Sequence, residues 1–268
     1  MILKFEIAYE TTIKEFIYKT ISRNFYGYLR ECGANYLVNN LICKPSDSIN
    51  PGDTLTIIYE EVKNKEGILN SSSIDILYED EFYLVVDKPP HLQSIPSRSN
   101  PSDSVFNRLL YYFKDTENTV HLINRLDKET NGLVLIAKSN YATAILKEFN
   151  KTYIAITDKK LPNNCGVIDL PILKVEKSIK REINEKGQQA ITLYKLIKED
   201  EFYTYEIELK TGRTHQIRLH FAHLGSPLIN DTLYGGTIFN DNELGLICRE
   251  IVFYHPILNK KITVISNY

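Results

Sequence analysis

The apolar positions of the first 60 residues follow two different periods. Ile13, Phe16 and Ile17 recur at three- and four-residue intervals, which is the spacing of one face of a helix. A second helical segment stops before Gly33, a residue that commonly ends helices. Two runs rich in apolar and β-branched residues then indicate short strands, with proline and glycine between them. The pattern predicts two helices and then two strands, at residues 11–20, 24–31, 36–43 and 53–59.

A polar segment, residues 61–73, separates this module from a longer apolar pattern. Short apolar runs predict strands at residues 82–87, 133–138, 152–156, 190–196 and 202–209. Helical spacing predicts helices at residues 102–113, 141–149 and 211–225, the last capped by Thr211 and ended by Gly225. Strands and helices do not alternate strictly, which favours an α+β fold over a doubly wound one. We expect a mixed, largely antiparallel β-sheet flanked by helices, preceded by a small α/β domain.

The composition is that of a globular protein with a core to bury. Of the 268 residues, 43% are hydrophobic and 25% are charged, and no apolar run approaches the roughly 20 residues of a membrane span. The N-terminus lacks the layout of a signal peptide, and the four cysteines show no paired metal spacing. These features predict a reduced, cytoplasmic protein with no membrane partner. Enrichment in Ile, Asn, Lys and Tyr indicates an AT-rich bacterial genome.

The most distinctive stretch, residues 124–132, reads Asn-Arg-Leu-Asp-Lys-Glu-Thr-Asn-Gly. Asn131-Gly132 predicts a turn because both residues tolerate positive φ, and the apolar run after it predicts a buried strand. Asp127 is therefore expected in a loop fixed by a core strand, where catalytic groups often lie. Arg125 and Lys128 would keep its carboxylate ionised, ready to act as nucleophile or base. The alternative is an ordinary charged turn.

A second dense segment, residues 210–225, holds three Lys/Arg and no acid. Four of its residues lie near the predicted helix start and off the apolar stripe: Arg213, Thr214, His215 and Arg218. The positive end of a helix together with two arginines favours anions. Residues 121–160 hold seven Lys/Arg against four acids. A chain with an isoelectric point near 6.3 thus carries two local basic patches, as a nucleic-acid binder requires.

Three histidines of this segment, His215, His220 and His223, suggest a metal site as one interpretation. The segment has no acidic ligand and the nearest cysteine is Cys248, so structural histidines or phosphate contacts are the favoured interpretation. Arg218 and Tyr153 also have purely structural interpretations. Arg218 could lie on a solvated helix face, and Tyr153 could occupy a half-buried strand position, where tyrosine is common.

Together these segments resemble the RluA-type pseudouridine synthases, over most of the chain. The family motif His-Arg-Leu-Asp-x-x-Thr-Ser-Gly-Leu stands here as residues 124–133, and its Lys-x-Tyr-x-Ala segment as residues 151–155. Residues 76–89 look like the family's opening strands, and residues 211–218 and 225–231 match its C-terminal signature. Several motifs in the family's order argue against a chance match.

This resemblance implies that uridine is isomerised to pseudouridine within RNA, with no cofactor. Asp127 matches the family's catalytic aspartate, which either attacks the ribose C1′ or removes a ribose proton. Arg218 aligns with the arginine that ion-pairs this aspartate, and Tyr153 with the tyrosine that stacks on the target base. Arg125 aligns with an arginine that can fill the space left by the flipped base. Further RNA contacts are expected from Arg213, Thr214 and His215.

Residues 1–60 resemble the small αL-type RNA-binding domain that many of these synthases carry, through Val38-Asn39-Asn40 and residues 49–53. We therefore expect domains at residues 1–60 and 74–268, joined by a linker. The small domain holds six Lys/Arg and seven acids, a poor charge balance for gripping phosphates. The presence of this domain favours large-subunit ribosomal RNA over transfer RNA as the substrate, because the domain is typical of the family members that modify ribosomal RNA. We expect a monomer whose partner is RNA.

Three departures from the family pattern leave other interpretations open. Asn124 stands for the usual His, Asn131 for the usual Ser, and Ile247-Cys248 for a late Leu-His-Ala signature. A non-catalytic RNA-binding protein on the same fold is one alternative. A synthase acting on transfer RNA is another, and a metal hydrolase built on the histidines is a third.

Overall fold

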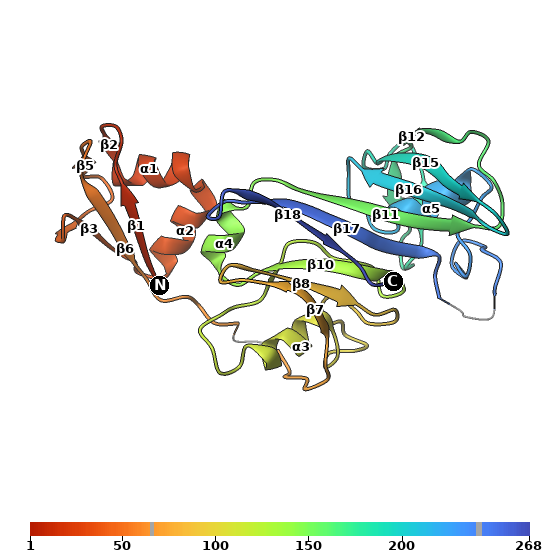
Figure 1. Ribbon diagram of the computed structural model, residues 1–268, viewed down its shortest axis with the longest axis horizontal. Helices are drawn as coiled ribbons and strands as arrows, with labels where there is room; N and C mark the ends of the chain where they lie inside the picture. The colour runs from red at the N-terminus through yellow and green to blue at the C-terminus, as the bar shows by residue number, and fades with distance from the viewer. Residues whose placement is uncertain (65–66, 240–242) are drawn as a thin grey trace.

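The computed structural model describes residues 1–64, 67–239 and 243–268. Its N-terminal part comprises β1 (Ile2–Glu6), β2 (Thr11–Thr12), α1 (Ile13–Thr20), α2 (Arg23–Glu31), β3 (Asn35–Val38), β4 (Leu41–Cys43), β5 (Ser48–Ile49) and β6 (Thr54–Ile58). Four of these strands form a sheet in the order β1-β6-β3-β4, with both helices beside it (Figure 1). Thr12 and Ser22 cap the helices, each with its side-chain oxygen accepting a backbone N–H.

Both helices predicted for this region are confirmed, but the single strand predicted at residues 36–43 is wrong. The segment is a hairpin of β3 and β4 that turns at Asn39 and Asn40, which have φ of 50° and 69°. Two consecutive residues with positive φ make the tight turn that suits a twisted hairpin. The apolar pattern also did not predict β1, which pairs antiparallel with β6.

The rest of the chain forms a large sheet, a small hairpin and three helices. The helices are α3 (Val105–Tyr112), α4 (Asn140–Ile145) and α5 (Gln216–His223). The strands are β7 (Asp75–Glu79), β8 (Tyr83–Lys88), β9 (His121–Leu122), β10 (Asn131–Ala137), β11 (Phe149–Thr157), β12 (Cys165–Asp169), β13 (Ile172–Lys174), β14 (Arg181–Ile183), β15 (Ile191–Glu199), β16 (Tyr203–Leu209), β17 (Leu246–His255) and β18 (Lys260–Ile265).

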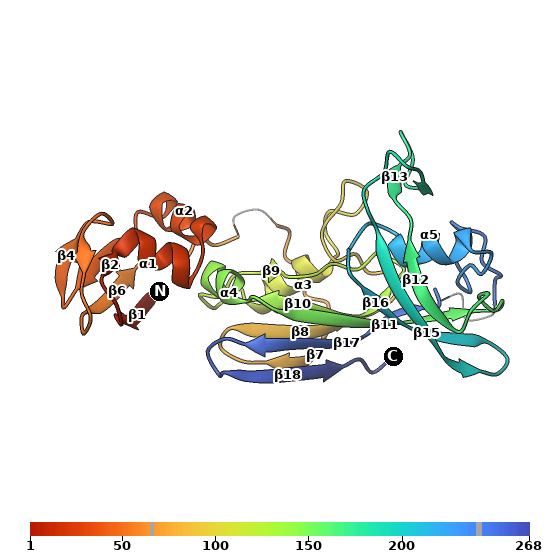
Figure 2. The same ribbon diagram turned by 90° about the horizontal axis from the view of Figure 1, so that it is seen from above.

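Ten of these strands make one sheet, in the order β12-β15-β16-β11-β17-β10-β8-β7, with β18 beside β17 and β9 beside β10. Strands β10 and β17 run parallel, and the remaining pairs within the described sheet are antiparallel. Every residue of β8 and β10 is buried, which explains their unbroken apolar runs. Helices α3 and α5 lie on one side of the sheet (Figure 2). The predicted α+β class and mixed, largely antiparallel sheet are confirmed.

The three predicted helices of this part exist, and each is shorter than expected. Helix α4 ends at Ile145 because the chain turns into β11 at Phe149. Helix α5 begins at Gln216, not after Thr211, because the Thr211 hydroxyl accepts from the N–H of Ile191 on β15. No helix among the described residues is long and apolar enough to cross a lipid bilayer.

The N-terminal part packs against α4. The Phe25 and Tyr141 rings lie 5.7 Å apart between α2 and α4. At the start of the predicted linker, Glu61 accepts hydrogen bonds from the backbone N–H and the side chain of Asn140, at 2.7 and 2.9 Å. Residues 65 and 66 of that segment lie outside the described residues. The connection is therefore attached to the larger part at its first residue.

Candidate active site

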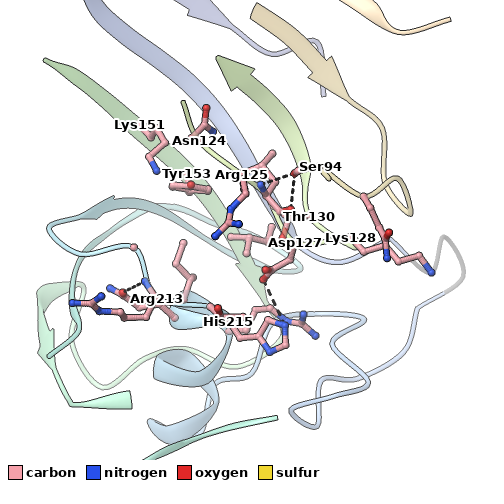
Figure 3. A pocket seen from close by; sticks show the side chains of 18 of the residues that line it. Ser94, Asn124, Arg125, Asp127, Lys128, Thr130, Lys151, Tyr153, Arg213 and His215 are labelled. Atoms are coloured by element: carbon pink, nitrogen blue, oxygen red, sulfur yellow. Dashed lines mark hydrogen bonds and ion pairs between the residues drawn. The ribbon is translucent and has the colours of Figure 1, made fainter. Parts of the chain in front are cut away.

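One pocket of about 570 Å³ brings together all seven residues that the sequence marked as candidate site residues. Asp127 and Arg125 come from the loop before β10, and Tyr153 comes from β11. Arg213, Thr214 and His215 come from the segment that leads into α5, and Arg218 comes from α5 itself. Figure 3 labels five of these side chains, which come from segments far apart in the sequence: Asp127, Arg125, Tyr153, Arg213 and His215. The candidates are Asp127, Tyr153, Arg218, Arg125, Arg213, Thr214 and His215.

The Asp127 loop is held by a buried serine and a short turn. The Ser94 hydroxyl donates to the Leu126 carbonyl at 2.8 Å and accepts from the Leu126 N–H at 2.9 Å. The Thr130 N–H donates to the Asp127 carbonyl at 3.2 Å, which closes a turn over residues 127–130. The Asp127 side chain remains 31% exposed, so a ligand in the pocket can reach it.

A buried lysine, Lys88, also fixes this loop through hydrogen bonds. Lys88, at the end of β8, has no exposed surface, and its ammonium donates to the carbonyls of Pro89, Leu92 and Lys128 at 2.9, 2.7 and 3.1 Å. Burial lowers the pKa of Lys88 to about 7, although Glu129 and Asp127 favour its charged form. The residue after Asp127 is thus tied to the core of the sheet.

Asn124, which replaces the family's histidine, has a structural role. Its side chain donates to the Leu133 carbonyl at 3.2 Å and accepts from the Leu135 N–H at 2.8 Å. The buried amide therefore satisfies two backbone groups of β10, as a neighbouring strand would.

The turn predicted at Asn131-Gly132 is wrong in place, because β10 already begins at Asn131. Gly132 does adopt the positive φ that the sequence suggested, with φ of +103°. A Cβ at this position would lie 2.3 Å from the Cys248 carbonyl of β17. Gly132 thus allows β17 to approach β10 directly behind the Asp127 loop.

The expected ion pair between Arg218 and Asp127 is not the one in the structure. Arg218 is buried and pairs in bidentate fashion with buried Asp231, at 2.8 and 2.7 Å. Burial opposes the guanidinium charge, but Asp231 outweighs it and raises the pKa of Arg218. Lys128 likewise points away from the pocket, its ammonium 3.7 Å from the Glu129 carboxylate (Figure 3).

The Nε2 atom of His215 lies 3.9 Å from the Asp127 carboxylate. His215 is the N-cap of α5 in a left-handed conformation, and its Nδ1 is 3.0 Å from the Tyr234 hydroxyl. Burial lowers the pKa of His215, Asp127 opposes this shift, and Arg218 and Arg181 add to it; because the net pKa falls below the ordinary value, the neutral imidazole predominates at neutral pH. Asp127 therefore faces a neutral ring.

Arg218 is connected to the His215 ring by way of Tyr234. Its guanidinium carbon lies 5.4 Å from the centre of the Tyr234 ring, whose hydroxyl contacts His215. A continuous set of contacts thus leads from Asp231 through Arg218 and Tyr234 to His215 and Asp127.

Tyr153 forms the floor of the pocket beside Asp127 (Figure 3). It is 5% exposed, and burial raises its pKa well above the ordinary value, with smaller contributions from Cys248 and Asp127. The phenol is therefore protonated at neutral pH, which suits a stacking surface and a hydrogen-bond donor better than a base.

The cationic rim of the pocket is exposed to solvent. Arg125, Arg213 and Thr214 are all exposed, and the Arg213 Nε donates to the Gln189 carbonyl at 3.1 Å. Their position at the mouth fits contacts with a polyanion that enters the pocket.

The three histidines do not converge on one point. Both ring nitrogens of buried His220 have partners, the Thr192 hydroxyl and the Leu170 carbonyl, each at 3.0 Å. Among the described residues, no group of three His, Cys, Asp or Glu side chains is arranged to hold a metal ion. The favoured structural interpretation of His220 agrees with these contacts.

Sequence analysis missed four residues that organise the site: Ser94, Lys88, Tyr234 and Asp231. Asp231 and Lys88 stand inside motifs that were recognised, yet no role was assigned to them. A buried charge needs a partner, so Arg218 alone on a helix with an apolar stripe could have prompted a search for an acid. Ser94 and Tyr234 have no signal in one sequence, because their partners come from distant loops.

Comparison with known proteins agrees with this geometry. A family model described as RNA pseudouridylate synthase matches residues 82–223. The chain is 35% identical to the uncharacterized RNA pseudouridine synthase YjbO of Bacillus subtilis (strain 168), over 92% of this chain and 91% of that protein. It is 32% identical to ribosomal large subunit pseudouridine synthase D of Pseudomonas aeruginosa, over 74% of this chain and 65% of that protein.

The fold also matches solved structures. Human RNA Pseudouridylate Synthase Domain Containing 1 aligns with a TM-score of 0.59 at 18% identity, over 74% of this chain and 85% of that chain. At this identity the likeness concerns the fold alone. The family model and the relatives go further: the chain belongs to the RNA pseudouridylate synthase family, in its RluA-type branch, and is an isomerase of that class.

Proposed function

We propose that this chain converts uridines of large-subunit ribosomal RNA to pseudouridine, with the Asp127 carboxylate as nucleophile or base. The observation that carries the proposal is the meeting of Asp127, Tyr153 and the α5 segment in one pocket with a cationic mouth. Relatives named as ribosomal large subunit synthases support this choice of RNA. A monomer in the cytoplasm, using its N-terminal part as an αL-type RNA-binding domain, completes the proposal.

The reaction breaks the N-glycosidic bond, turns the uracil within the pocket, and joins its C5 to the ribose C1′. C5 then loses its proton and N1 gains one, so the atoms balance. Product and substrate have the same atoms and oxidation state, so the reaction requires no cofactor. A free Asp127 oxygen attacks C1′, or it removes a ribose proton to give a glycal. The partly exposed carboxylate suits both routes, because no Lys or Arg among the described residues has its nitrogen within 4 Å of it.

The target base must leave the RNA helix to reach Asp127. Tyr153 then stacks on the flipped uracil, and the Arg125 side chain fills the space that the base vacates. Arg213, Thr214 and His215 contact the RNA at the mouth of the pocket. Arg218 is a positioning residue: it fixes Tyr234, and Tyr234 in turn fixes the ring of His215 beside Asp127.

The test compares pseudouridine maps of ribosomal and transfer RNA from a strain that lacks the gene. We expect at least one large-subunit pseudouridine to be missing, and to return with the wild-type protein but not with Asp127→Asn. Asp115→Asn is the matched control, because Asp115 is exposed and lies outside the pocket. Restoration by Asp127→Asn would refute the role of Asp127. A change confined to transfer RNA would reassign the substrate.

A further inference from the structure

Strand β11 presents a lysine beside the tyrosine of the pocket. Lys151 and Tyr153 are two residues apart, on the same face of the strand, and both line the pocket. The Lys151 ammonium lies 5.9 Å from the centre of the Tyr153 ring and 5.4 Å from that of Phe149. In Figure 3 its nitrogen points toward Tyr153, with Asp127 on the other side of the ring.

Lys151 has aromatic rings beside its ammonium but, unlike Lys88 and Lys138, neither a hydrogen-bond acceptor nor an ion-pair partner in the described part of the chain. Lys88 donates to three carbonyls, and Lys138 contacts the Glu79 carboxylate at 2.6 Å. Among the described residues, no hydrogen-bond acceptor and no carboxylate within 4 Å serves Lys151. Burial accordingly lowers the pKa of Lys151. The adjacent Cys248 cannot neutralise the ammonium, because burial raises the pKa of its thiol to about 12.

A partly buried cation that faces a pocket without a hydrogen-bond acceptor calls for one from the ligand. We propose that the Lys151 ammonium binds a carbonyl oxygen of the flipped uracil and stabilises the base after the glycosidic bond breaks. The inference rests on the proposed function, and it assigns a task that Asp127, Tyr153 and Arg218 do not perform.

The detached uracil needs such a group. When the C1′–N1 bond breaks, its electron pair leaves with the base, and the negative charge spreads over N1, O2 and O4. This holds whether Asp127 attacks C1′ or removes a ribose proton. A preorganised cation in a pocket with little water stabilises charge that develops in this way.

The symmetry of uracil lets one lysine serve before and after the turn. Rotation by half a turn about the axis through N3 and C6 exchanges N1 with C5, which is the exchange that the reaction requires. The same rotation exchanges O2 with O4. A donor fixed at the edge of the Tyr153 platform therefore meets a carbonyl oxygen in both orientations, and the base stays bound while it turns.

Lys151→Met tests the inference, because methionine keeps the packing against Phe149 and Tyr153 and removes the charge. The RNA is bulk ribosomal RNA from the strain that lacks the gene. Single-turnover rates at saturating enzyme should fall by about 100-fold, while the Kd for this RNA changes little. Lys151→Arg should retain more activity than Lys151→Met. Lys261→Met is the matched control, since Lys261 is exposed on β18, outside the pocket.

A second readout separates charge stabilisation from shape. Fluorine at C5 makes the uracil anion more stable on its own, so a transcript containing 5-fluorouridine should depend less on Lys151. We expect the Lys151→Met defect in consumption of 5-fluorouridine to be about tenfold smaller than its defect with uridine. Equal defects with both bases would overturn the inference, because they would indicate a structural role.

The remaining outcomes are also decisive. A normal single-turnover rate for Lys151→Met would overturn the inference, and so would a defect confined to the Kd, which would mark a phosphate contact. Either result would leave the proposed function intact if wild type is active and Asp127→Asn is not. An inactive wild-type protein would instead refute the proposed function, and the role of Lys151 with it.

Discussion

Lys88 should make the stability of the protein depend on pH in a way that one substitution removes. The ammonium is fully buried, and its three acceptors are neutral backbone carbonyls, so charge is held there against a large desolvation cost. Its pKa of about 7 in the folded protein compares with about 10.4 in an unfolded chain. Between these two values the unfolded chain binds a proton that the folded protein does not.

The sign and size of the effect follow from proton linkage. Because the unfolded state binds more protons in this window, the free energy of unfolding rises as pH increases from about 7 to about 10. From pH 7 to pH 9 the Lys88 contribution rises by about 2 kcal/mol, and over the whole window by about 4 kcal/mol. Below pH 7 the contribution is constant, because both states are then protonated.

Urea unfolding of the wild-type protein and of Lys88→Met at pH 7, 8 and 9 measures this. Other groups titrate in the same range, but they do so in both proteins, so the difference between the two isolates Lys88. From pH 7 to pH 9 the free energy of unfolding of the wild-type protein should rise by about 2 kcal/mol relative to that of the variant. A difference that stays flat across this range would show that the ammonium is not desolvated as its contacts indicate, and would refute the reasoning.

Two further changes test the supports of the site. Asp231→Asn leaves the Arg218 guanidinium buried without its counter-ion, so the free energy of unfolding should fall by about 3–5 kcal/mol in urea titrations; a loss below about 1 kcal/mol would contradict the pairing. Asn124→Ala strips the buried Leu135 N–H of its acceptor and should cost about 2 kcal/mol of stability by the same measurement, whereas an unchanged midpoint would show that β10 does not need this side chain.

The local parts of the fold could be predicted from one sequence. The helices at Ile13–Thr20 and Val105–Tyr112 follow from apolar spacing and a capping hydroxyl, both of which lie within a few residues. The ends of elements were less predictable when distant groups fix them. Thr211 looked like a helix cap, but a strand N–H twenty residues upstream takes its hydroxyl, and α5 begins only at Gln216.

For the site, the sequence predicted which residues meet but not how they pair. The motif order pointed to Asp127, Tyr153 and Arg218, and all three line one pocket. The pairings of β17 with β10 and with β11 bring the segments of Asp127 and Tyr153 together, and α5 carries Arg218. The partner of each residue could not be predicted. Pairing depends on which acid lies on the loop after α5, and that loop is placed by tertiary contacts such as the hydrogen bond from the Ile229 N–H to the Ile156 carbonyl of β11.

The pairing of Arg218 with Asp231 has a consequence for the chemistry of Asp127. A bidentate guanidinium occupies both oxygens of its carboxylate, and a carboxylate held in this way is a poor nucleophile until the pair breaks. Here Asp231 takes that role, so the buried arginine is neutralised without occupying Asp127. Asp127 instead has a neutral imidazole 3.9 Å away and, among the described residues, no Lys or Arg nitrogen within 4 Å of its carboxylate. Asp231 thus stabilises the fold around the pocket, and our proposal assigns the reactive carboxylate to Asp127.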